Sequence, residues 1–313
     1  MYESYFGLTE SPFALSPDPR YMYLSPQHSE ALNCLLYGIH EKKGFMAVTG
    51  GIGTGKTTLC RFLLSEFDDS VKTALIFNPS LSDIELLKTV NQEFGVRIGS
   101  GRGTKKRYID ALNDFLLRNF SDGKNAVLII DEAQNLSHGA MEQIRMLSNL
   151  ETASEKLLQI VLLGQPELLG MLALPSLRQL NERITVRCEL KELGRADVSR
   201  YIGRRISKAS GNADEIFSAA GYYAVYRGSG GIPRRINAIC DRALLIAYGK
   251  DKKRVDQRIV WSAIQDLGPG YLTNLPVKRA RFLFEITVAL LLWAIMILFG
   301  YGYFFGDFPW LRY

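Results

Sequence analysis

The sequence predicts an α/β fold in which a mainly parallel sheet is covered by helices on both faces. Short apolar runs typical of buried strands alternate with helical patterns up to residue 190. A glycine-rich octapeptide at residues 50–57 joins the first of these strands to a helix. Beyond residue 195 the strand patterns stop and only helical patterns follow, which predicts a second, helical domain.

Composition limits the class of protein. A chain of 313 residues is too long for one small core, so two domains with additional segments are expected. The formal net charge of +6 suits contact with nucleic acid or an anionic membrane and establishes neither. The start of the chain lacks the basic and apolar parts of a signal peptide. Four scattered cysteines without a C-x-x-C pair favour isolated thiols over a metal site or disulfides: Cys34, Cys60, Cys188 and Cys240.

Residues 1–44 are expected to form an N-terminal strap followed by a helix. Aromatic residues and prolines such as Phe13 and Pro19 suggest an extended segment that packs on the core. Ser25 followed by Pro26 predicts the start of a helix, because proline fits the first helical turn. Apolar residues then continue at helical spacing as far as Ile39.

The octapeptide matches the phosphate-binding pattern G-x-x-x-x-G-K-[ST] at every fixed position. A predicted strand at 45–49 precedes it and a helix at 58–64 follows, which is the context that the motif requires. Glycines allow successive backbone N–H groups to point at phosphate oxygens, and the helix N-terminus favours the same anion. Lys56 is expected to reach the β- and γ-phosphates, and Thr57 to bind Mg²⁺. The residues expected to bind nucleotide are Gly50, Gly51, Ile52, Gly53, Thr54, Gly55, Lys56, Thr57, Thr58 and Asp131.

The remaining elements of the ATPase core, residues 45–190, follow in alternation. Ser82 with Glu85 predicts a capping box at the start of a helix. The basic, glycine-rich stretch 97–107 is interpreted as a solvated connection, with contact to a polyanion as the alternative. Further strands are predicted at 73–77, 126–130, 158–164 and 184–188, and further helices at 108–120 and 137–150.

Two carboxylates follow the strand at 126–130. Asp131 is expected to act on Mg²⁺, and Glu132 to polarise the attacking water. Acidic residues also favour an ordinary helix N-terminus. Because a phosphate loop lies upstream at a suitable distance, the catalytic interpretation is preferred.

Three further residues are candidates for catalysis. Gln165 ends the next strand and is expected to orient the water, although a plain turn before Pro166 explains it equally well. Arg178 and Arg183 are each candidates for an arginine finger that enters a neighbouring subunit, or for ordinary surface residues of a helix. Arg183 is favoured because it lies closest to the last strand.

Residues 191–270 are expected to form a helical lid domain. Pro233 opens one of its helices, and Arg234 is expected to project from it toward the phosphates, so that the bound nucleotide sets the lid angle. The lid helices are predicted near 196–210, 213–227, 233–248 and 256–267.

The last part of the chain predicts a membrane anchor. After a linker at 271–282, a transmembrane helix is predicted at 283–305, because the almost unbroken apolar run at 286–305 is long enough to cross a bilayer, and the tail 306–313 follows. Basic residues just before the run place the large N-terminal part on the cytoplasmic side. The predicted localisation is therefore the bacterial inner membrane, single-pass, with a cytoplasmic ATPase domain and a short periplasmic tail. The alternative is a buried helix of a soluble domain.

Taken together, these motifs resemble an AAA+ ATPase of the P-loop NTPase class, with Walker A, Walker B, a sensor 1 candidate and a sensor 2 arginine in a helical lid. More narrowly, the chain is similar over residues 1–270 to the general secretion pathway protein A (ExeA-type) family. The stretches that carry this resemblance are Tyr5-Phe6-Gly7-Leu8, Ser11-Pro12-Phe13, Pro17-Asp18-Pro19, Tyr23-Leu24-Ser25, Asp131-Glu132-Ala133-Gln134 and Gly164-Gln165-Pro166-Glu167-Leu168.

The resemblance implies an ASCE-type αβα sandwich that binds ATP and Mg²⁺ and hydrolyses ATP between the subunits of a homo-oligomer. It also implies an inner-membrane or periplasmic partner in an export system, with relatives beside pilus, exosortase and exopolysaccharide systems. Secretion-type members continue into a periplasmic peptidoglycan-binding region, whereas only 306–313 follow the predicted membrane helix here. A partner protein is therefore expected to carry the signal across the membrane.

Three functions are compatible with these features. The preferred one is an ATP-driven factor for assembly of a bacterial envelope export system. The alternative is a nucleic-acid-associated AAA+ ATPase related to transposition helpers or origin-recognition proteins, for which Arg204-Arg205 and the basic stretch 250–254 are suited. No recognition-helix module follows the lid, so nucleic acid is the less favoured partner. A switch that binds ATP without hydrolysing it is disfavoured by Glu132.

Overall fold

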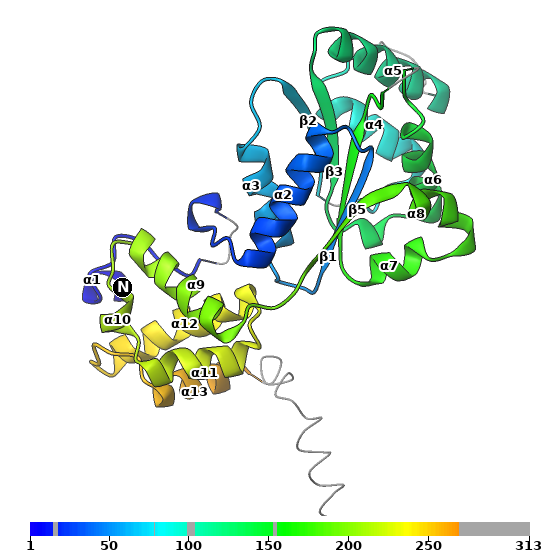
Figure 1. Ribbon diagram of the computed structural model, residues 1–313. Coiled ribbons are helices and arrows are strands. Elements are labelled where there is room, and N and C mark those ends of the chain that lie inside the picture. Colours follow the sequence, from blue (N-terminus) through cyan, green and yellow to red (C-terminus); the bar gives the residue numbers. More distant parts are fainter. Residues whose placement is uncertain (15–17, 78, 99–103, 153–154, 269–313) are drawn as a thin grey trace, which may run out of the picture.

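The computed structural model describes residues 1–14, 18–77, 79–98, 104–152 and 155–268, which form a sheet-containing part and a helical part (Figure 1). The strands are β1 (Phe45–Gly50), β2 (Val71–Ile76), β3 (Asn125–Ile130), β4 (Gln159–Gly164) and β5 (Ile184–Leu190). The helices are α1 (Tyr2–Tyr5), α2 (Pro26–His40), α3 (Lys56–Ser65), α4 (Asp83–Glu93), α5 (Lys105–Ser121), α6 (His138–Leu147), α7 (Glu167–Leu172), α8 (Arg178–Arg183), α9 (Arg195–Lys208), α10 (Ala213–Ile216), α11 (Ala219–Ser229), α12 (Pro233–Gly249) and α13 (Gln257–Asp266), with 3₁₀ turns at Pro19–Tyr21, Ala133–Asn135 and Pro175–Leu177.

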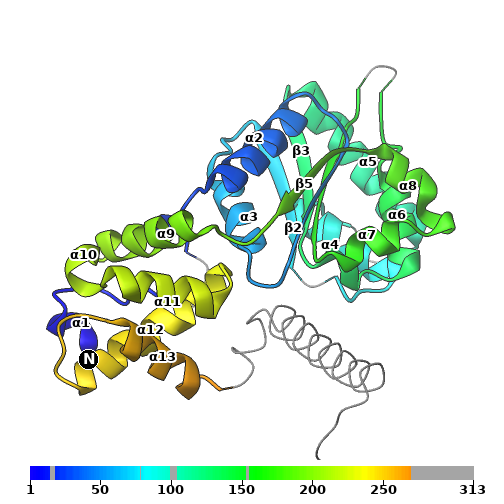
Figure 2. The same ribbon diagram turned by 60° about the horizontal axis from the view of Figure 1, so that its bottom comes forward.

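The five strands pair only in parallel, in the order β2-β3-β4-β1-β5. Side chains of one strand alternate between two apolar cores, as in β1, where Phe45 and Ala47 face one core and Met46 and Val48 the other. Helices α2 and α3 cover one face of the sheet, and α4 to α8 cover the other (Figures 1 and 2). The predicted α/β fold with a parallel sheet and P-loop NTPase character is confirmed.

One predicted helix start agrees with the structure, and two predicted boundaries differ from it. The Ser82 hydroxyl and the Glu85 carboxylate form the predicted capping box of α4. The predicted basic connection ends earlier than expected, because Thr104 caps α5 and its first turn takes up the basic residues from Lys105 onward. The helix predicted at 213–227 is divided into α10 and α11, because Phe217 leaves the helix and is buried beside Val255.

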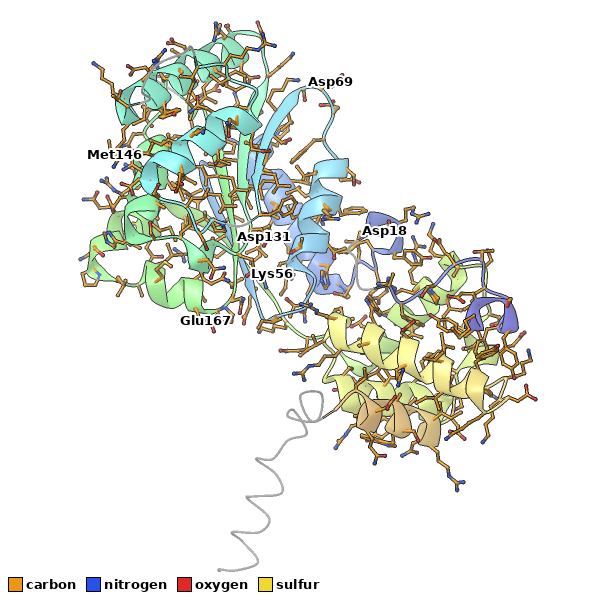
Figure 3. The ribbon with its side chains drawn as sticks, turned by 180° about the vertical axis from the view of Figure 1, so that it is seen from behind. Asp18, Lys56, Asp69, Asp131, Met146 and Glu167 are labelled. Atoms are coloured by element: carbon orange, nitrogen blue, oxygen red, sulfur yellow. The ribbon has the colours of Figure 1, made fainter. Side chains whose placement is uncertain are left out.

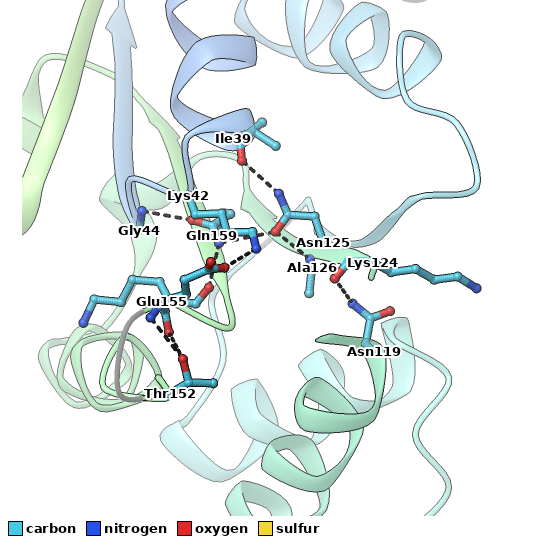
Figure 4. A network of polar contacts seen from close by, with 11 residues as sticks. Ile39, Lys42, Gly44, Asn119, Lys124, Asn125, Ala126, Thr152, Glu155 and Gln159 are labelled. Carbon is cyan, nitrogen blue, oxygen red and sulfur yellow. Dashed lines mark hydrogen bonds and ion pairs between the residues drawn. The ribbon is translucent and has the colours of Figure 1, made fainter. Parts of the chain in front are cut away.

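A buried polar network holds the end of the sheet opposite the glycine-rich loop (Figure 4). The Gln159 side chain is fully buried; its Oε1 accepts from the Gly44 N–H at 2.9 Å, and its Nε2 donates to the Lys156 carbonyl at 3.2 Å. The Asn125 Nδ2 donates to the Ile39 carbonyl at 2.8 Å, which joins the end of α2 to β3. These side chains satisfy backbone groups that the strand ends leave unpaired.

Helices α9 to α13 form the helical part around a core of their own (Figure 1). The N-terminal segment belongs to this core: Leu8 and Phe13 are buried in it, and the Tyr2 hydroxyl donates to Asp241 of α12 at 2.5 Å. The expected strap therefore packs on the helical part rather than on the sheet core, and its first residues form α1. From there the chain crosses to α2 on the sheet.

No described helix is long and apolar enough to cross a membrane. The longest described helices, α5 and α12, have 17 residues each, which reach about 26 Å against a bilayer core of about 30 Å. Both also carry charged residues along their length. This finding contradicts the predicted single-pass inner-membrane localisation. The segment 283–305, with its linker and tail, lies outside the described residues.

The network around Gln159 leads to a prediction about stability. In Gln159→Ala the buried Gly44 N–H loses its acceptor, and we expect the free energy of unfolding to fall by about 2–4 kcal/mol in urea denaturation. Gln92→Ala, at an exposed position of α4, is the control and is expected to stay within about 0.5 kcal/mol of wild type. Equal stability of the two variants would show that the network contributes little.

Candidate active site

The glycine-rich loop between β1 and α3 is folded by two glycines in left-handed conformations, Gly53 with φ +79° and Gly55 with φ +105°. The Thr54 hydroxyl donates to the Gly51 carbonyl at 2.9 Å and closes the turn. Lys56 is 5% exposed, and its Nζ donates to the carbonyls of Gly50 and Gly51 at 2.8 and 3.0 Å. The first N–H groups of a helix have no partner within the helix, so the start of α3 directly after this loop suits an anion.

Asp131 lies at the end of β3, beside this loop. The Thr57 hydroxyl donates to Asp131 Oδ2 at 2.6 Å, and the Asp131 N–H donates to the Ile76 carbonyl at 2.8 Å. Lys56 and Asp131 lie close together at the edge of the sheet that faces the helical part (Figure 3). A hydroxyl and a carboxylate are oxygen donors of the kind that Mg²⁺ prefers, so the pair fits this ion.

Glu132 is held by two amides. Its Oε2 accepts from Gln134 Nε2 at 2.6 Å and from Gln165 Nε2 at 3.1 Å, and Gln134 Oε1 accepts from the Gln165 N–H at 3.0 Å. Burial raises the pKa of Glu132, but the two amide hydrogen bonds and the charge of Lys56 outweigh burial, so the pKa lies below its ordinary value. The carboxylate is therefore ionised at neutral pH and fixed in direction.

The backbone of Glu132 is left-handed, with φ +51°. A non-glycine residue rarely adopts this conformation, and strained residues of this kind concentrate at functional sites.

The Lys56 amine has its pKa lowered by burial, although the nearby negative charges of Glu132, Asp131 and Glu167 oppose this effect.

The helical part contacts the loop directly at α12. The Arg234 N–H donates to the Gly53 carbonyl at 3.3 Å, and a Cβ on Gly53 would lie 2.7 Å from the Arg234 Cβ. A cavity of about 320 Å³ lies between the two parts. Arg234 lines this cavity together with Lys56, Thr57 and Glu132, so the sheet and the helical part both contribute charged groups to it.

The same cavity also has aromatic lining residues. Tyr21 and Tyr23 reach it from the N-terminal segment, and Tyr201, Arg205 and Asn237 from the helical part. The Arg205 guanidinium is buried, lies 4.9 Å from the centre of the Tyr21 ring and donates to the Tyr201 hydroxyl at 2.9 Å. Flat aromatic surfaces beside a cation suit a nucleobase. The basic pair Arg204-Arg205 suggested a surface contact with nucleic acid, but the buried Arg205 is not available for one.

Two candidate arginines lie away from the cavity of their own chain. Arg183 Nη1 donates to the Ser148 hydroxyl at 2.7 Å and also contacts Asn149, at the end of α6. Arg178 pairs with Glu182 at 2.9 Å on an exposed face of α8. Neither lines the cavity, so the structure does not bring them together with Lys56. A role in a neighbouring subunit stays a prediction.

Besides the aromatic lining of the cavity, two residues that contact the predicted site residues were not predicted. Gln134 lies in the stretch after Asp131, and only the folded turn shows that it holds both Glu132 and Gln165. His28 lies on the buried face of α2, at helical spacing with Leu32, a position that is usually structural. Its Nε2 lies 3.1 Å from the Thr54 carbonyl of the glycine-rich loop.

Comparisons with known proteins agree with this geometry. Residues 39–172 match the family model described as AAA domain. Over 255 residues the chain is 46% identical to general secretion pathway protein A of Aeromonas hydrophila, an alignment that covers 82% of this chain and 46% of that protein. The chain thus spans about half the length of this curated relative. The predicted resemblance is confirmed.

Solved structures share the fold at low identity. Cdc6p of Pyrobaculum aerophilum is 16% identical, with a TM-score of 0.66, over 91% of this chain and 79% of that chain. The Aeropyrum pernix ORC2 protein, in its ADPNP–ADP complexes, is 15% identical, with a TM-score of 0.58, over 80% of this chain and 72% of that chain. At such identities the likeness concerns the fold alone.

The buried His28 leads to a prediction about pH. Burial lowers its pKa, against the opposing effects of the Thr54 carbonyl and the Asp197 charge. Below about pH 6.5 the unfolded chain therefore binds more protons here than the folded chain, so the stability contributed by neutral His28 is complete above this pH and declines below it.

We expect the free energy of unfolding, measured by urea denaturation, to fall more in wild type than in His28→Gln between about pH 7.5 and pH 5.5. His40→Gln removes an exposed imidazole from the other end of α2 and is expected to follow wild type. Parallel pH curves for wild type and His28→Gln would rule out the contribution of His28.

Proposed function

The chain is an AAA-domain protein related to general secretion pathway protein A, and from this premise we propose that it binds and hydrolyses MgATP to drive or regulate assembly of a bacterial envelope export system. The observation that carries the hydrolysis proposal is the convergence of Lys56, Thr57, Asp131 and Glu132 from α3 and the end of β3. Such a cluster supplies a phosphate-binding lysine, oxygen ligands for a metal and an oriented base close to one another.

The proposed mechanism assigns one task to each group of the chain. Lys56 and the N–H groups of the glycine-rich loop hold the phosphates. Thr57 and Asp131 would hold Mg²⁺, which would neutralise phosphate charge when bound. The Glu132 carboxylate, aimed by Gln134 and Gln165, orients a water for in-line attack and accepts its proton.

The helical part is proposed to respond to the nucleotide. Arg234 lines the same cavity as Lys56, and its backbone is hydrogen-bonded to Gly53. A γ-phosphate that contacts Arg234 would favour a closed arrangement of α12 over the loop, and its loss would release that contact. ATP turnover would thereby change the angle between the two parts.

The proposed link to an export system depends on the aligned relative. The aligned relative supports a secretion role by its name, and the chain covers 46% of that relative, so partners of its remaining half do not transfer. The alternative of a nucleic-acid-associated ATPase is less well supported. The likeness to ORC2 and Cdc6p concerns the fold alone, and Arg205, one of the basic residues suited to phosphate contacts, is buried.

The first test is ATP turnover by the full chain. Glu132→Gln is expected to lower kcat by about 10²- to 10⁴-fold, because the amide cannot accept the proton, while MgATP affinity stays near that of wild type. Lys56→Ala is expected to weaken binding itself by about tenfold or more, since it removes a charge-assisted contact to phosphate. Phosphate release and fluorescent-nucleotide titration measure the two effects.

Equally slow turnover by wild type and Glu132→Gln would favour a switch that binds ATP without using it. Binding of duplex DNA that depends on ATP and weakens steeply with salt would favour the nucleic-acid alternative.

A second test concerns Arg183, proposed to enter a neighbouring subunit's site in a homo-oligomer. Arg183→Ala is expected to lower turnover by about 10³-fold, and mixing it with Lys56→Ala protein is expected to restore part of the activity, because one mixed interface then contains both intact groups. Arg178→Ala, at an exposed position of the neighbouring turn, is the control and is expected to retain activity. Absence of any recovery in the mixture would remove Arg183 from the site.

A further inference from the structure

His28 connects the first turn of α2 to the glycine-rich loop. The imidazole is 3% exposed, and its Nε2 lies 3.1 Å from the Thr54 carbonyl. On the other side of the ring, Nδ1 lies 2.7 Å from the hydroxyl of Ser25, the N-cap residue of α2. Both partners are themselves buried, so solvent does not compete for these contacts.

The partners define the tautomer of the ring. A carbonyl oxygen only accepts, so Nε2 carries the hydrogen and donates it to Thr54. Nδ1 is then the acceptor, and the Ser25 hydroxyl donates to it while the Ser25 Oγ accepts from the His28 N–H at 3.4 Å. Ser25 thereby holds both the backbone and the ring of His28 in one orientation.

The contact with Thr54 also sets the direction of a donor in the loop. In a trans peptide the C=O and the N–H point to opposite sides. Because His28 holds the Thr54 carbonyl on the α2 side, the N–H of the same peptide unit, which belongs to Gly55, points away from His28. In the part of the chain that the structure describes, no protein group accepts from this N–H.

Gly55 fits this arrangement for two reasons. Its φ of +105° is strained for a residue with a side chain, and a Cβ there would lie 3.0 Å from His28 Nε2. The close approach of the imidazole and the left-handed turn therefore depend on the same glycine.

We propose that His28 is a positioning residue of the phosphate site, which holds the Thr54–Gly55 peptide so that the Gly55 N–H donates to a phosphate oxygen of the nucleotide. The inference rests on the proposed nucleotide binding. It adds a residue of α2, outside the glycine-rich loop itself, to the groups that prepare the loop for its ligand. His28 acts through the peptide and does not touch the phosphate.

The test is titration of the full chain with fluorescent MgADP and MgATP. His28→Ala is expected to weaken both by about tenfold, because one hydrogen bond to a charged phosphate is misdirected. His28→Gln places an amide N–H within reach of the Thr54 carbonyl and is expected to return to within about threefold of wild type. His28→Asn has the same amide one methylene shorter and is expected to behave like His28→Ala. His40→Ala, at the exposed end of α2, is the matched control and is expected to bind like wild type.

A spectroscopic signature separates positioning from general loss of structure. In ¹⁵N-labelled wild type and His28→Gln, saturating MgADP is expected to shift the Gly55 amide proton downfield, and in His28→Asn this shift is expected to be much smaller. Unchanged affinity in His28→Asn, or equal weakening in the Gln and Asn variants with the Gly55 shift retained, would overturn the proposal. Failure of wild type itself to bind nucleotide would instead overturn the proposed function.

Discussion

The parallel order of the strands is the constraint on which the site depends. Because β4 lies between β1 and β3 and all three strands are parallel, their carboxyl ends are adjacent. The glycine-rich loop, Asp131 and Gln165 directly follow these three ends. The hydrogen bond from the Thr57 hydroxyl to Asp131 then joins the helix after β1 to the end of β3. At the amino ends of the strands, the Gln159 and Asn125 side chains form hydrogen bonds with the backbone groups of Gly44 and Ile39.

The contact between the two parts of the molecule follows from small residues at the loop. Gly53 leaves room for the Ile232 and Arg234 side chains at the start of α12. Gly231 leaves room for the segment that leads from β5 into α9, where a Cβ would lie 2.2 Å from the Leu193 carbonyl. The Leu193 N–H donates to the Gly231 carbonyl at 2.9 Å. Backbone hydrogen bonds, from Arg234 to Gly53 and from Leu193 to Gly231, therefore border the cavity, and the proposed movement of α12 would act on the loop through them.

Features encoded by neighbouring residues were predictable from the sequence. The phosphate motif, the Ser82 capping box and the alternation of strands and helices each depend on short spacing, and the structure contains them. Features that join distant residues were not predictable. The splitting of α10 from α11 depends on Phe217 meeting Val255, and the place of the N-terminal strap depends on Tyr2 meeting Asp241. Local pattern contains no information on which distant surface a segment meets.

Glu132 shows how these two kinds of information combine in the site. An acidic residue after an apolar strand is visible in the sequence, but its left-handed backbone and its two amide partners arise only when the turn after β3 packs against the end of β4. Gln134 is hydrogen-bonded to both sides of this junction, to the Glu132 carboxylate and to the Gln165 N–H. The orientation of the proposed base is thus set by the pairing of β3 with β4. The strand order that brings the phosphate-binding groups together therefore also places the Glu132 carboxylate beside them.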